Sequence, residues 1–386
     1  MDHRSFEPQN FPPAKIPGLY VHIPFCQTKC PYCNFYSITS VSEIPDFLMA
    51  LLGEIEMVRS EWNRFDTVYI GGGTPSLLSP HQLEMIITKI QNHFSLLPET
   101  EITLEANPAD LRLSYLASLR KIGITRLSLG VQSFEQKTLE FLGRRHSVRE
   151  AISAIEVSRQ AGFDHIGMDL IYAVPGQTLE SWVDTLSQAV AFSPEHISCY
   201  QLTIEGDAPL GTAYRTGKFS SPSEGEQCDF FMITAEELER AKFVHYEVSN
   251  FARGSEYASR HNQKYWNHTP YLGLGPSAHS FSDGRRWWNY RSVGRYISAV
   301  KAGKLPIEGR ETLSLEQLRM EAFFLGLRTK KGIHLEDFCR QYQCDLMSEK
   351  GRTLTKLREE GFLSLRDGYL FPTRTGLAVA DTLALI

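Results

Sequence analysis

Three cysteines within eight residues constrain this chain more than any other feature. They are Cys26, Cys30 and Cys33, and their spacing is C-x3-C-x2-C. Because thiolates are soft ligands, such a group suits an iron–sulfur cluster, copper(I) or zinc. A structural zinc ion and an ordinary four-iron cluster both use four protein ligands. A loop that offers only three therefore leaves one metal position open, and an open position is where chemistry takes place.

Two other interpretations fit these cysteines less well. A single cysteine is often a buried packing residue, but three at ligand spacing beside Pro31 rarely are. A zinc site would need a fourth ligand, and the sequence has no second C-x2-C pair. The remaining cysteines lie far downstream, at Cys199, Cys228, Cys339 and Cys344. His22 is the other candidate ligand, although a strand-like segment precedes it and Pro24 follows. The spacing favours a cluster over zinc.

Length and charge place the chain in a broad class. Its 386 residues are enough for about two or three domains. A net charge of −5 gives no general attraction to nucleic acid or to an anionic membrane. No apolar run approaches the length of a membrane span, and Met1–Asn10 lacks the apolar core of a secretory signal. Seven cysteines without framework spacing indicate a reducing compartment, so we expect a cytoplasmic protein.

Short apolar runs alternate with helical patterns about six times through the first half of the chain. The strand-like runs are Leu19–Ile23, Thr67–Ile70, Glu101–Glu105, Arg126–Gly130, His165–Ile171 and His196–Ile204. The helical patterns are Asp46–Trp62, Gln82–His93, Leu111–Ile122, Arg149–Ala161 and Leu179–Phe192. This alternation predicts an α/β fold built from βα units around a parallel sheet. Periodicity alone does not distinguish an open sheet from a barrel.

Four segments follow from the change in pattern along the chain. They are a loose Pro-containing arm (1–18), the βα region (19–240), an aromatic-rich connecting region (241–310) and a C-terminal domain (311–386). We expect 206–224 to be loop, because it is rich in Gly, Pro, Ser and Thr. The C-terminal domain shows helical patterns and then a hairpin around Asp367-Gly368, as in a winged helix. The range from Lys330 to Ile386 contains nine Lys or Arg and eight Asp or Glu, so this domain lacks the basic surface of a DNA-binding domain.

Polar or glycine-rich residues lie at or just beyond the ends of most of the predicted strands. They are Gly71-Gly72-Gly73-Thr74-Pro75, Glu105, Gln132, Asp169 and Thr203. Because the carboxyl ends of parallel strands meet at one edge, we expect these residues to gather at the mouth that carries the cysteine loop. Glycines let the backbone approach a ligand closely, and carboxylates can accept hydrogen bonds from ribose hydroxyls. The alternatives are a tight turn at the glycines and ion pairing of the acids with Arg126 or Arg144.

The cysteine spacing after a strand resembles the signature of the radical S-adenosylmethionine (SAM) superfamily. The wider string Tyr20-Val-His-Ile-Pro-Phe-Cys26 resembles the branch that holds oxygen-independent coproporphyrinogen III oxidase and a haem chaperone. The resemblance covers most of the chain. It implies a partial (β/α)6 barrel with a helical, winged-helix-like C-terminal domain. It also implies a [4Fe–4S] cluster on Cys26, Cys30 and Cys33, with the amino acid end of SAM on the fourth iron.

The same resemblance implies a set of SAM contacts. These are Tyr20, Gly72, Gly73, Thr74, Glu105, Gln132, Arg144 and Asp169. The glycine segment would hold the amino group, the two acids the ribose, and Gln132 with Arg144 the methionine moiety. Arg145 adjoins Arg144, so this assignment could shift by one residue. No residue is assigned as catalytic, and whether SAM is cleaved in the protein's function stays open.

Two departures and one motif separate the members of that branch. The oxidase pattern continues to a fourth cysteine, where this chain has Phe35, and the oxidase has a longer N-terminal arm than the 25 residues before Cys26. His261, Tyr265 and Trp266 match an HNxxYW motif that resembles the haem chaperone. Imidazole is a common haem ligand, and aromatic rings suit a flat macrocycle. The alternative is a hydrogen-bonded His261 among packing aromatics, with His268 or His279 as the haem ligand.

The resemblance therefore implies a haem chaperone that binds haem and delivers it to acceptor proteins, for example respiratory enzymes. The alternative is the oxidase, an enzyme of porphyrin biosynthesis. We expect neither nucleic acid nor a membrane span among its partners, and a homodimer stays open.

Overall fold

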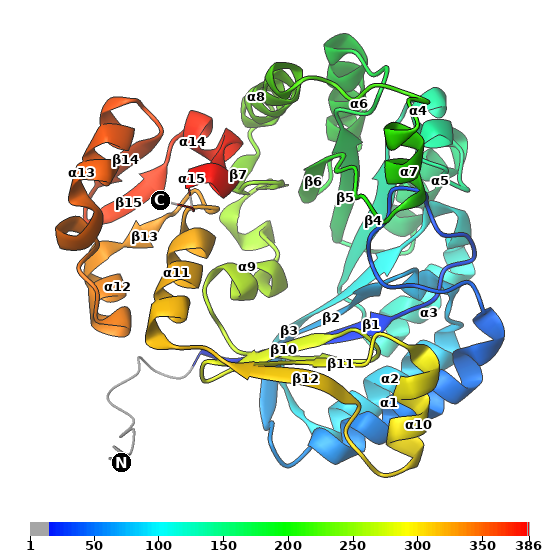
Figure 1. Cartoon of the computed structure of the whole chain (residues 1–386). Coiled ribbons are helices and arrows are strands. Elements are labelled where there is room, and N and C mark those ends of the chain that lie inside the picture. The colour runs from blue at the N-terminus through cyan, green and yellow to red at the C-terminus, as the bar shows by residue number, and fades with distance from the viewer. Residues whose placement is uncertain (1–14, 384, 386) are drawn as a thin grey trace, which may run out of the picture.

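Six parallel strands form the centre of one sheet in the computed structural model, which describes residues 15–383 and 385 (Figure 1). Expectations for Met1–Asn10 and for most of the arm over 1–18 lie outside the described residues. The central strands are β1 (Gly18–Ile23), β2 (Arg64–Gly72), β3 (Ser95–Ala106), β4 (Arg126–Gln132), β5 (His165–Tyr172) and β6 (His196–Gln201). They pair in sequence order. The predicted α/β fold with a partial (β/α)6 barrel is confirmed.

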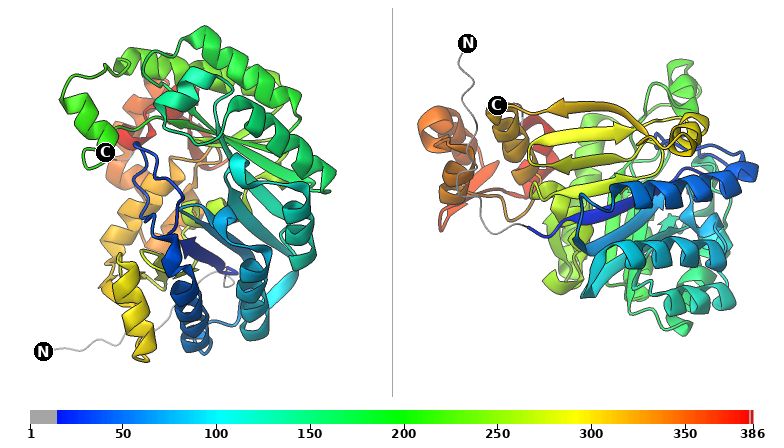
Figure 2. Two further views of the ribbon diagram at one scale, coloured as in Figure 1. Left: turned by 90° about the vertical axis from the view of Figure 1, so that its right-hand side faces the viewer. Right: turned by 90° about the horizontal axis from the view of Figure 1, so that it is seen from below.

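Helices cover the outer side of these strands (Figures 1 and 2). They are α1 (Ile44–Val58), α2 (Pro80–His93), α3 (Leu113–Ile122), α4 (Gln136–Phe141), α5 (Val148–Gln160) and α6 (Leu179–Ala191). Each of α2, α5 and α6 begins at a Ser or Thr in a reciprocal capping box, which satisfies backbone donors of the first turn. Leu19, Val21 and Ile23 of β1 are fully buried in the core between strands and helices. The other residues of β1 face the inside of the barrel.

The expectation of loop over 206–224 was wrong in part. A short helix, α7 (Pro209–Arg215), begins with a proline, whose missing N–H is tolerated in the first turn. The Gly- and Thr-rich composition gave no helical signal. Tertiary packing holds the helix instead, because Leu210 is buried in a small apolar cluster with Leu142. The sixth strand is also shorter than predicted and ends at Gln201.

The range 241–310 extends the same sheet at both sides, after helix α8 (Glu224–Arg240). Its elements are β7 (Val244–Glu247), β8 (Asn250–Ala252), α9 (Arg260–Trp266), β9 (Tyr271–Leu274), β10 (His279–Ser282), β11 (Arg285–Asn289), α10 (Val293–Lys301) and β12 (Ile307–Thr312). Strand β8 pairs with β6, whereas β9 returns to pair with β1, so the order is β12-β11-β10-β9-β1-β2-β3-β4-β5-β6-β8-β7. The sheet is therefore an open barrel wall of twelve strands.

The C-terminal domain lies across the opening of this wall (Figure 1). It holds α11 (Leu315–Gly326), β13 (Ile333–His334), α12 (Leu335–Tyr342), α13 (Leu346–Glu359), β14 (Leu363–Arg366), β15 (Tyr369–Pro372), α14 (Arg374–Ala378) and α15 (Ala380–Leu383). Its three strands form a separate antiparallel sheet, and its apolar residues form their own core. The predicted winged-helix-like arrangement is confirmed. Val248 N–H donates to the Arg328 carbonyl and joins the domain to the β7 side of the sheet.

No helix among residues 15–383 is both long and apolar enough to cross a membrane.

Candidate cluster and cofactor site

The cysteine loop follows β1 at the carboxyl end of the barrel. Its base is closed by two backbone hydrogen bonds, from Cys26 N–H to the Ile38 carbonyl at 2.9 Å and from Ile38 N–H to the Pro24 carbonyl at 2.8 Å. A turn joins the other two cysteines, because Cys33 N–H donates to the Cys30 carbonyl at 3.1 Å. The loop is thereby fixed at its base, while the thiols are presented to one pocket.

The three thiols line that pocket together with Gly73, Thr74, Asn107 and Arg144. Thr74 Oγ1 donates to Cys26 Sγ at 3.4 Å, and Arg144 Nη1 donates to Cys30 Sγ at 3.4 Å. Two of the three sulfurs therefore accept a hydrogen bond from the wall of the pocket.

The arrangement of the three thiols fits a four-iron cluster better than a single metal ion. Within residues 15–383, no three His, Cys, Asp or Glu side chains converge as ligands of one metal ion. In a [4Fe–4S] cluster each thiolate binds a different iron, so three thiols around one pocket suit it. His22 does not act as a fourth ligand in this arrangement. Its Nδ1 pairs with the Tyr20 hydroxyl and its Nε2 with the Tyr36 carbonyl, both at 2.9 Å.

The glycine segment packs directly on the cysteine loop. Gly73 N–H donates to the Ile23 carbonyl at 2.8 Å, and Thr74 N–H donates to the Phe25 carbonyl at 2.7 Å. Gly72 has a φ of 114°, and a Cβ there would clash with the His22 ring. These N–H groups are occupied, whereas the Gly73 carbonyl accepts no hydrogen bond from the described residues. The segment can therefore offer an acceptor to a ligand amino group.

Glu105 is a partly buried acid near the end of β3. Its carboxylate accepts hydrogen bonds from the Tyr69 hydroxyl at 2.8 Å and from Gly72 N–H at 3.0 Å. Burial raises the pKa of Glu105 to about 7, and the nearby Asp169 adds to the rise. An acid with this pKa changes its charge near neutral pH, so its protonation responds to a ligand.

Asp169 on β5 lies beside Ser128 of β4 in the barrel interior. It accepts a hydrogen bond from the Ser128 hydroxyl at 2.9 Å, and burial raises its pKa. Glu105 and Asp169 thus come from β3 and β5 to one mouth, as the strand-end rule predicts. Neither forms an ion pair among the described residues, so the alternative pairing with Arg126 or Arg144 is absent there. Arg126 instead lies 3.6 Å from Glu101.

The structure distinguishes Arg144 from Arg145. Arg144 Nη2 donates to the Gly130 carbonyl at 2.9 Å, beside its contact with Cys30. Its Nε is buried without a hydrogen-bond partner among the described residues. A buried, unpaired donor is costly unless a ligand completes it. Arg145 instead faces Asp110 at 2.5 Å. Gln132 lies near Arg144 and has an unusual φ of 66°.

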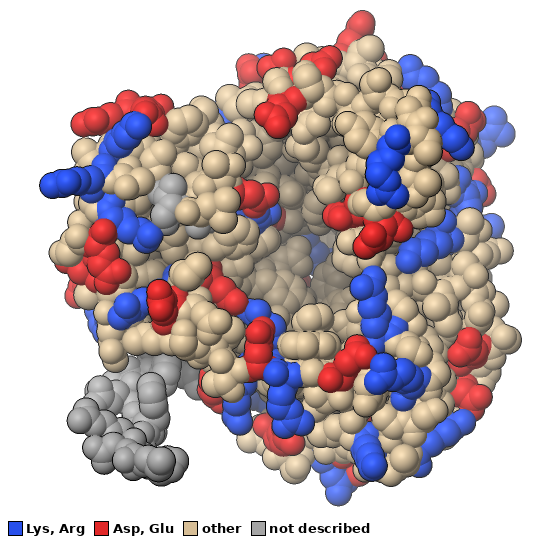
Figure 3. Space-filling view, in the orientation of Figure 1, with Lys and Arg blue, Asp and Glu red and all other residues tan. Residues whose placement is uncertain are grey.

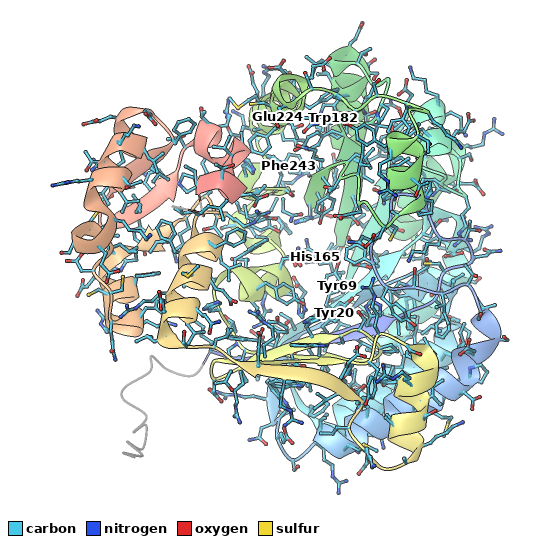
Figure 4. All side chains as sticks on the ribbon, in the orientation of Figure 1. Tyr20, Tyr69, His165, Trp182, Glu224 and Phe243 are labelled. Carbon is cyan, nitrogen blue, oxygen red and sulfur yellow. The ribbon has the colours of Figure 1, made fainter. Side chains whose placement is uncertain are left out.

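Tyr69 was not expected as a site residue. Its ring stacks on that of Tyr20 with centroids 6.2 Å apart (Figure 4). Its hydroxyl donates a hydrogen bond to Glu105. Burial raises the pKa of both phenols. The sequence held one signal, because Tyr69 is the inward-facing residue between Val68 and Ile70 of β2.

The HNxxYW motif lies inside the barrel against the tyrosines of the SAM site, because the His261 ring stacks on Tyr69 with centroids 5.2 Å apart and lies 6.4 Å from the Tyr20 ring. Helix α9 packs against the start of β2, where His261 Nδ1 pairs with Thr67 Oγ1 at 2.9 Å. Thr67 precedes Gly72 by five residues, so about 16 Å of strand separates Thr67 itself from the glycine segment. His261 is 1% exposed, and its Nε2 pairs with the Tyr265 hydroxyl at 3.0 Å. Both ring nitrogens are engaged, so this geometry does not support His261 as a haem ligand.

The two aromatic residues of the motif also have local partners. Tyr265 packs edge-on against Tyr271, and the Arg328 guanidinium lies 5.4 Å from the Trp266 ring. The Trp266 indole N–H is buried without a hydrogen-bond partner in the described structure. The open alternative of a hydrogen-bonded histidine among packing aromatics describes this region well.

Comparisons with known proteins agree with this geometry. The radical SAM superfamily profile matches residues 20–189, and the HemN C-terminal domain profile matches 313–379. The haem chaperone HemW of Mycobacterium tuberculosis is 35% identical over 330 residues, 84% of each chain. HemW of Bacillus subtilis is 32% identical over 363 residues, 92% of this chain and 95% of the relative. The structure of coproporphyrinogen III oxidase (HemN) from Escherichia coli superposes with a TM-score of 0.84 at 22% identity, covering 96% of this chain and 90% of that one.

The barrel, the three-cysteine loop and the profile define a radical SAM protein. Within that superfamily the chain belongs to the HemN-like branch, and it is most like HemW.

Proposed function

We propose that this protein is a haem chaperone, which binds haem and passes it to acceptor proteins. The observation that carries the proposal is similarity to curated HemW proteins over 84–92% of the chain, including the C-terminal domain. Relatives that share the whole architecture support a shared function more strongly than a shared barrel does.

Phe35 argues against the alternative, the oxidase. The residue stands where the oxidase pattern has its fourth cysteine, and its side chain is 68% exposed beside the cysteine loop. A phenyl group cannot bind a metal or transfer a proton, so chemistry that depends on a thiol there is lost. The fold similarity to HemN concerns the architecture alone.

The barrel mouth supports binding of a cluster and of SAM. Cys26, Cys30 and Cys33 would hold three irons of a [4Fe–4S] cluster, which, when bound, supplies an electron to the sulfonium of SAM. The Gly73 carbonyl is suited to the SAM amino group, and the unpaired Nε of Arg144 to its carboxylate. Glu105 is suited to a ribose hydroxyl. Tyr20, Gly72, Thr74, Gln132 and Asp169 complete the proposed contacts.

The proposed partners are haem and haem-accepting proteins, respiratory enzymes among them, and a second copy of this chain. The proposed location is the cytoplasm, where a reducing environment keeps thiols available for a cluster.

Anaerobic reconstitution with iron and sulfide, followed by titration with hemin, tests the proposal. We expect saturable hemin binding and transfer of the bound hemin to an apo-haem protein, followed by absorption. The oxidase assay, conversion of coproporphyrinogen III to protoporphyrinogen IX under the same reducing conditions, should give no turnover. Absence of hemin binding, or turnover in that assay, would refute the proposal.

A further inference from the structure

A histidine and a tryptophan lie side by side on the β9–β12 part of the sheet. His279 on β10 pairs with Trp288 on β11, and Trp288 pairs with Gly309 on β12. The imidazole and indole rings stack with centroids 5.7 Å apart and planes inclined by 25°. A Cβ at Gly309 would clash with the indole, so the absence of a side chain there makes room for Trp288. We call these three residues the His279 site.

The His279 site faces the C-terminal domain. Alternate residues of a strand share a face, so Arg286 and Trp288 point to the same side of β11. Arg286 pairs with Glu321 on α11 at 2.6 Å, whereas Trp287 points the other way and packs near Trp62 in the core. Figure 3 shows a hollow at the centre of the molecule, between the barrel and the C-terminal domain, and Figure 1 places β10 and β11 along its lower edge.

This site is also close to the SAM pocket. Gly273 on β9 pairs with Tyr20 on β1, and a Cβ at Gly273 would clash with the backbone carbonyl of His279. One strand therefore separates Tyr20 from His279, which places their backbones about 10 Å apart. A ligand as broad as a porphyrin could contact both residues from the hollow.

His279 differs from His261 and His268 in the hydrogen bonding of its ring nitrogens. Its side chain is exposed, and neither nitrogen has a hydrogen-bond partner among the described residues. His261 pairs through both nitrogens, and His268 pairs with the Tyr342 hydroxyl at 3.1 Å and lies 3.4 Å from Glu321. Partial desolvation of the ring and the nearby Arg286 lower the pKa of His279. A neutral imidazole with a free nitrogen is the form that binds iron.

We propose that His279 is an axial ligand of the haem iron. The inference rests on the proposed haem chaperone function and names the residue that would hold the cargo. An axial imidazole stands perpendicular to the macrocycle, so Trp288, which lies nearly parallel to the imidazole, presents its edge to haem. Trp288 is therefore a positioning residue that fixes the orientation of the ring.

Hemin titration of the reconstituted full-length protein tests this assignment, with absorption and electron paramagnetic resonance (EPR) as readouts. We expect His279→Ala to weaken hemin binding at least tenfold and to remove the spectroscopic signature of an imidazole ligand. His81→Ala is the matched control, because its side chain is 80% exposed on α2 and joins no haem proposal. It should leave both readouts unchanged. Wild-type affinity and spectrum in His279→Ala would overturn the inference.

Two further variants separate ligation from folding. His279→Met replaces one iron ligand with another, so hemin should still bind with a shifted spectrum. Trp288→Leu should weaken binding while the imidazole signature persists. A loss of hemin binding in His81→Ala as well would overturn the specific role of His279. If the wild-type protein bound no hemin at all, the proposed chaperone function would fail, which is a different result from failure of the His279 assignment.

Discussion

The carboxylate of Glu54 on α1 accepts a hydrogen bond from Gly275 N–H at 2.8 Å, across 221 residues of sequence. The same group accepts hydrogen bonds from the Tyr296 hydroxyl at 2.6 Å and from Asn289 Nδ2 at 2.5 Å. Gly275 has a φ of 93°, and a Cβ there would clash with the His22 carbonyl. One buried acid thus ties α1, α10 and β11 to a loop that packs on β1, just before the cysteines.

Replacement of this acid should destabilise the whole fold. Glu54→Ala would leave the Gly275 N–H and the Tyr296 hydroxyl without an acceptor, whereas Asn289 Nδ2 keeps the Gly275 carbonyl at 3.0 Å. Each unpaired donor costs about 1–3 kcal/mol, although the costs do not simply add. We expect the free energy of unfolding of the cofactor-free protein to fall by about 3 kcal/mol in urea denaturation. Glu61→Ala, an exposed position just after the same helix, should change it by less than about 0.5 kcal/mol. Equal effects would contradict the role of this network.

The raised pKa of Glu105 predicts a pH dependence of stability. Its folded pKa is about 7, whereas an unfolded glutamate has a pKa of about 4.3. Between these values the folded state holds a proton that the unfolded state has lost. The free energy of unfolding therefore falls as pH rises through this window, by about 1.4 kcal/mol per pH unit for one such group, and levels off above pH 7. Glu54 and Glu247, also with pKa values of about 7, act in the same direction.

Urea denaturation of the cofactor-free protein at pH 5.5 and pH 7 measures the share of Glu105. Glu105→Gln cannot ionise, so the fall between the two pH values should be smaller than in the wild type by about 2 kcal/mol. Glu61→Gln should keep the wild-type difference. An unchanged pH dependence in Glu105→Gln would mean that this acid is already ionised at pH 5.5.

The alternation of apolar strands and helices was enough to predict an α/β fold with a parallel sheet, because burial on both faces makes each parallel strand a continuous apolar run. The partial barrel was implied only by the family resemblance. The strand-end rule likewise assigned Glu105 and Asp169 to one mouth, where β3 and β5 bring them. Both predictions depend on local patterns that survive folding unchanged.

Those local patterns could not predict contacts between residues that are distant in the sequence. Nothing near His261 indicates that Thr67, 194 residues away, will pair with its ring. The return of β9 to β1 also depends on strand order, which no periodicity encodes. These two facts bury His261 of the HNxxYW motif between Thr67 and the Tyr69 ring, and leave His279 on the open face. The motif resemblance alone favours the buried histidine.

Arg144 and Arg145 offer a paired test of the SAM site. Arg144 has a buried, unpaired Nε beside Cys30, whereas Arg145, which also lines the pocket, is held by Asp110. We expect Arg144→Ala to weaken SAM binding at least tenfold in equilibrium dialysis of the reconstituted protein, because a charge-assisted hydrogen bond to the ligand carboxylate is lost. Arg145→Ala should lower affinity by less than about threefold. The reverse order would shift the assignment by one residue.

The iron content of cysteine variants should distinguish the three proposed cluster ligands from the other four cysteines. Cys30→Ala removes one of three proposed ligands, so reconstitution should no longer give about four irons per chain or the visible absorption of a cluster. SAM binding should fall with it, because the open iron position is lost. Cys228→Ala, an exposed thiol on α8, should keep both properties. Circular dichroism should show the same folded structure for each variant before reconstitution. A full cluster in Cys30→Ala, or its loss in Cys228→Ala, would contradict the ligand assignment on which the SAM and haem proposals depend.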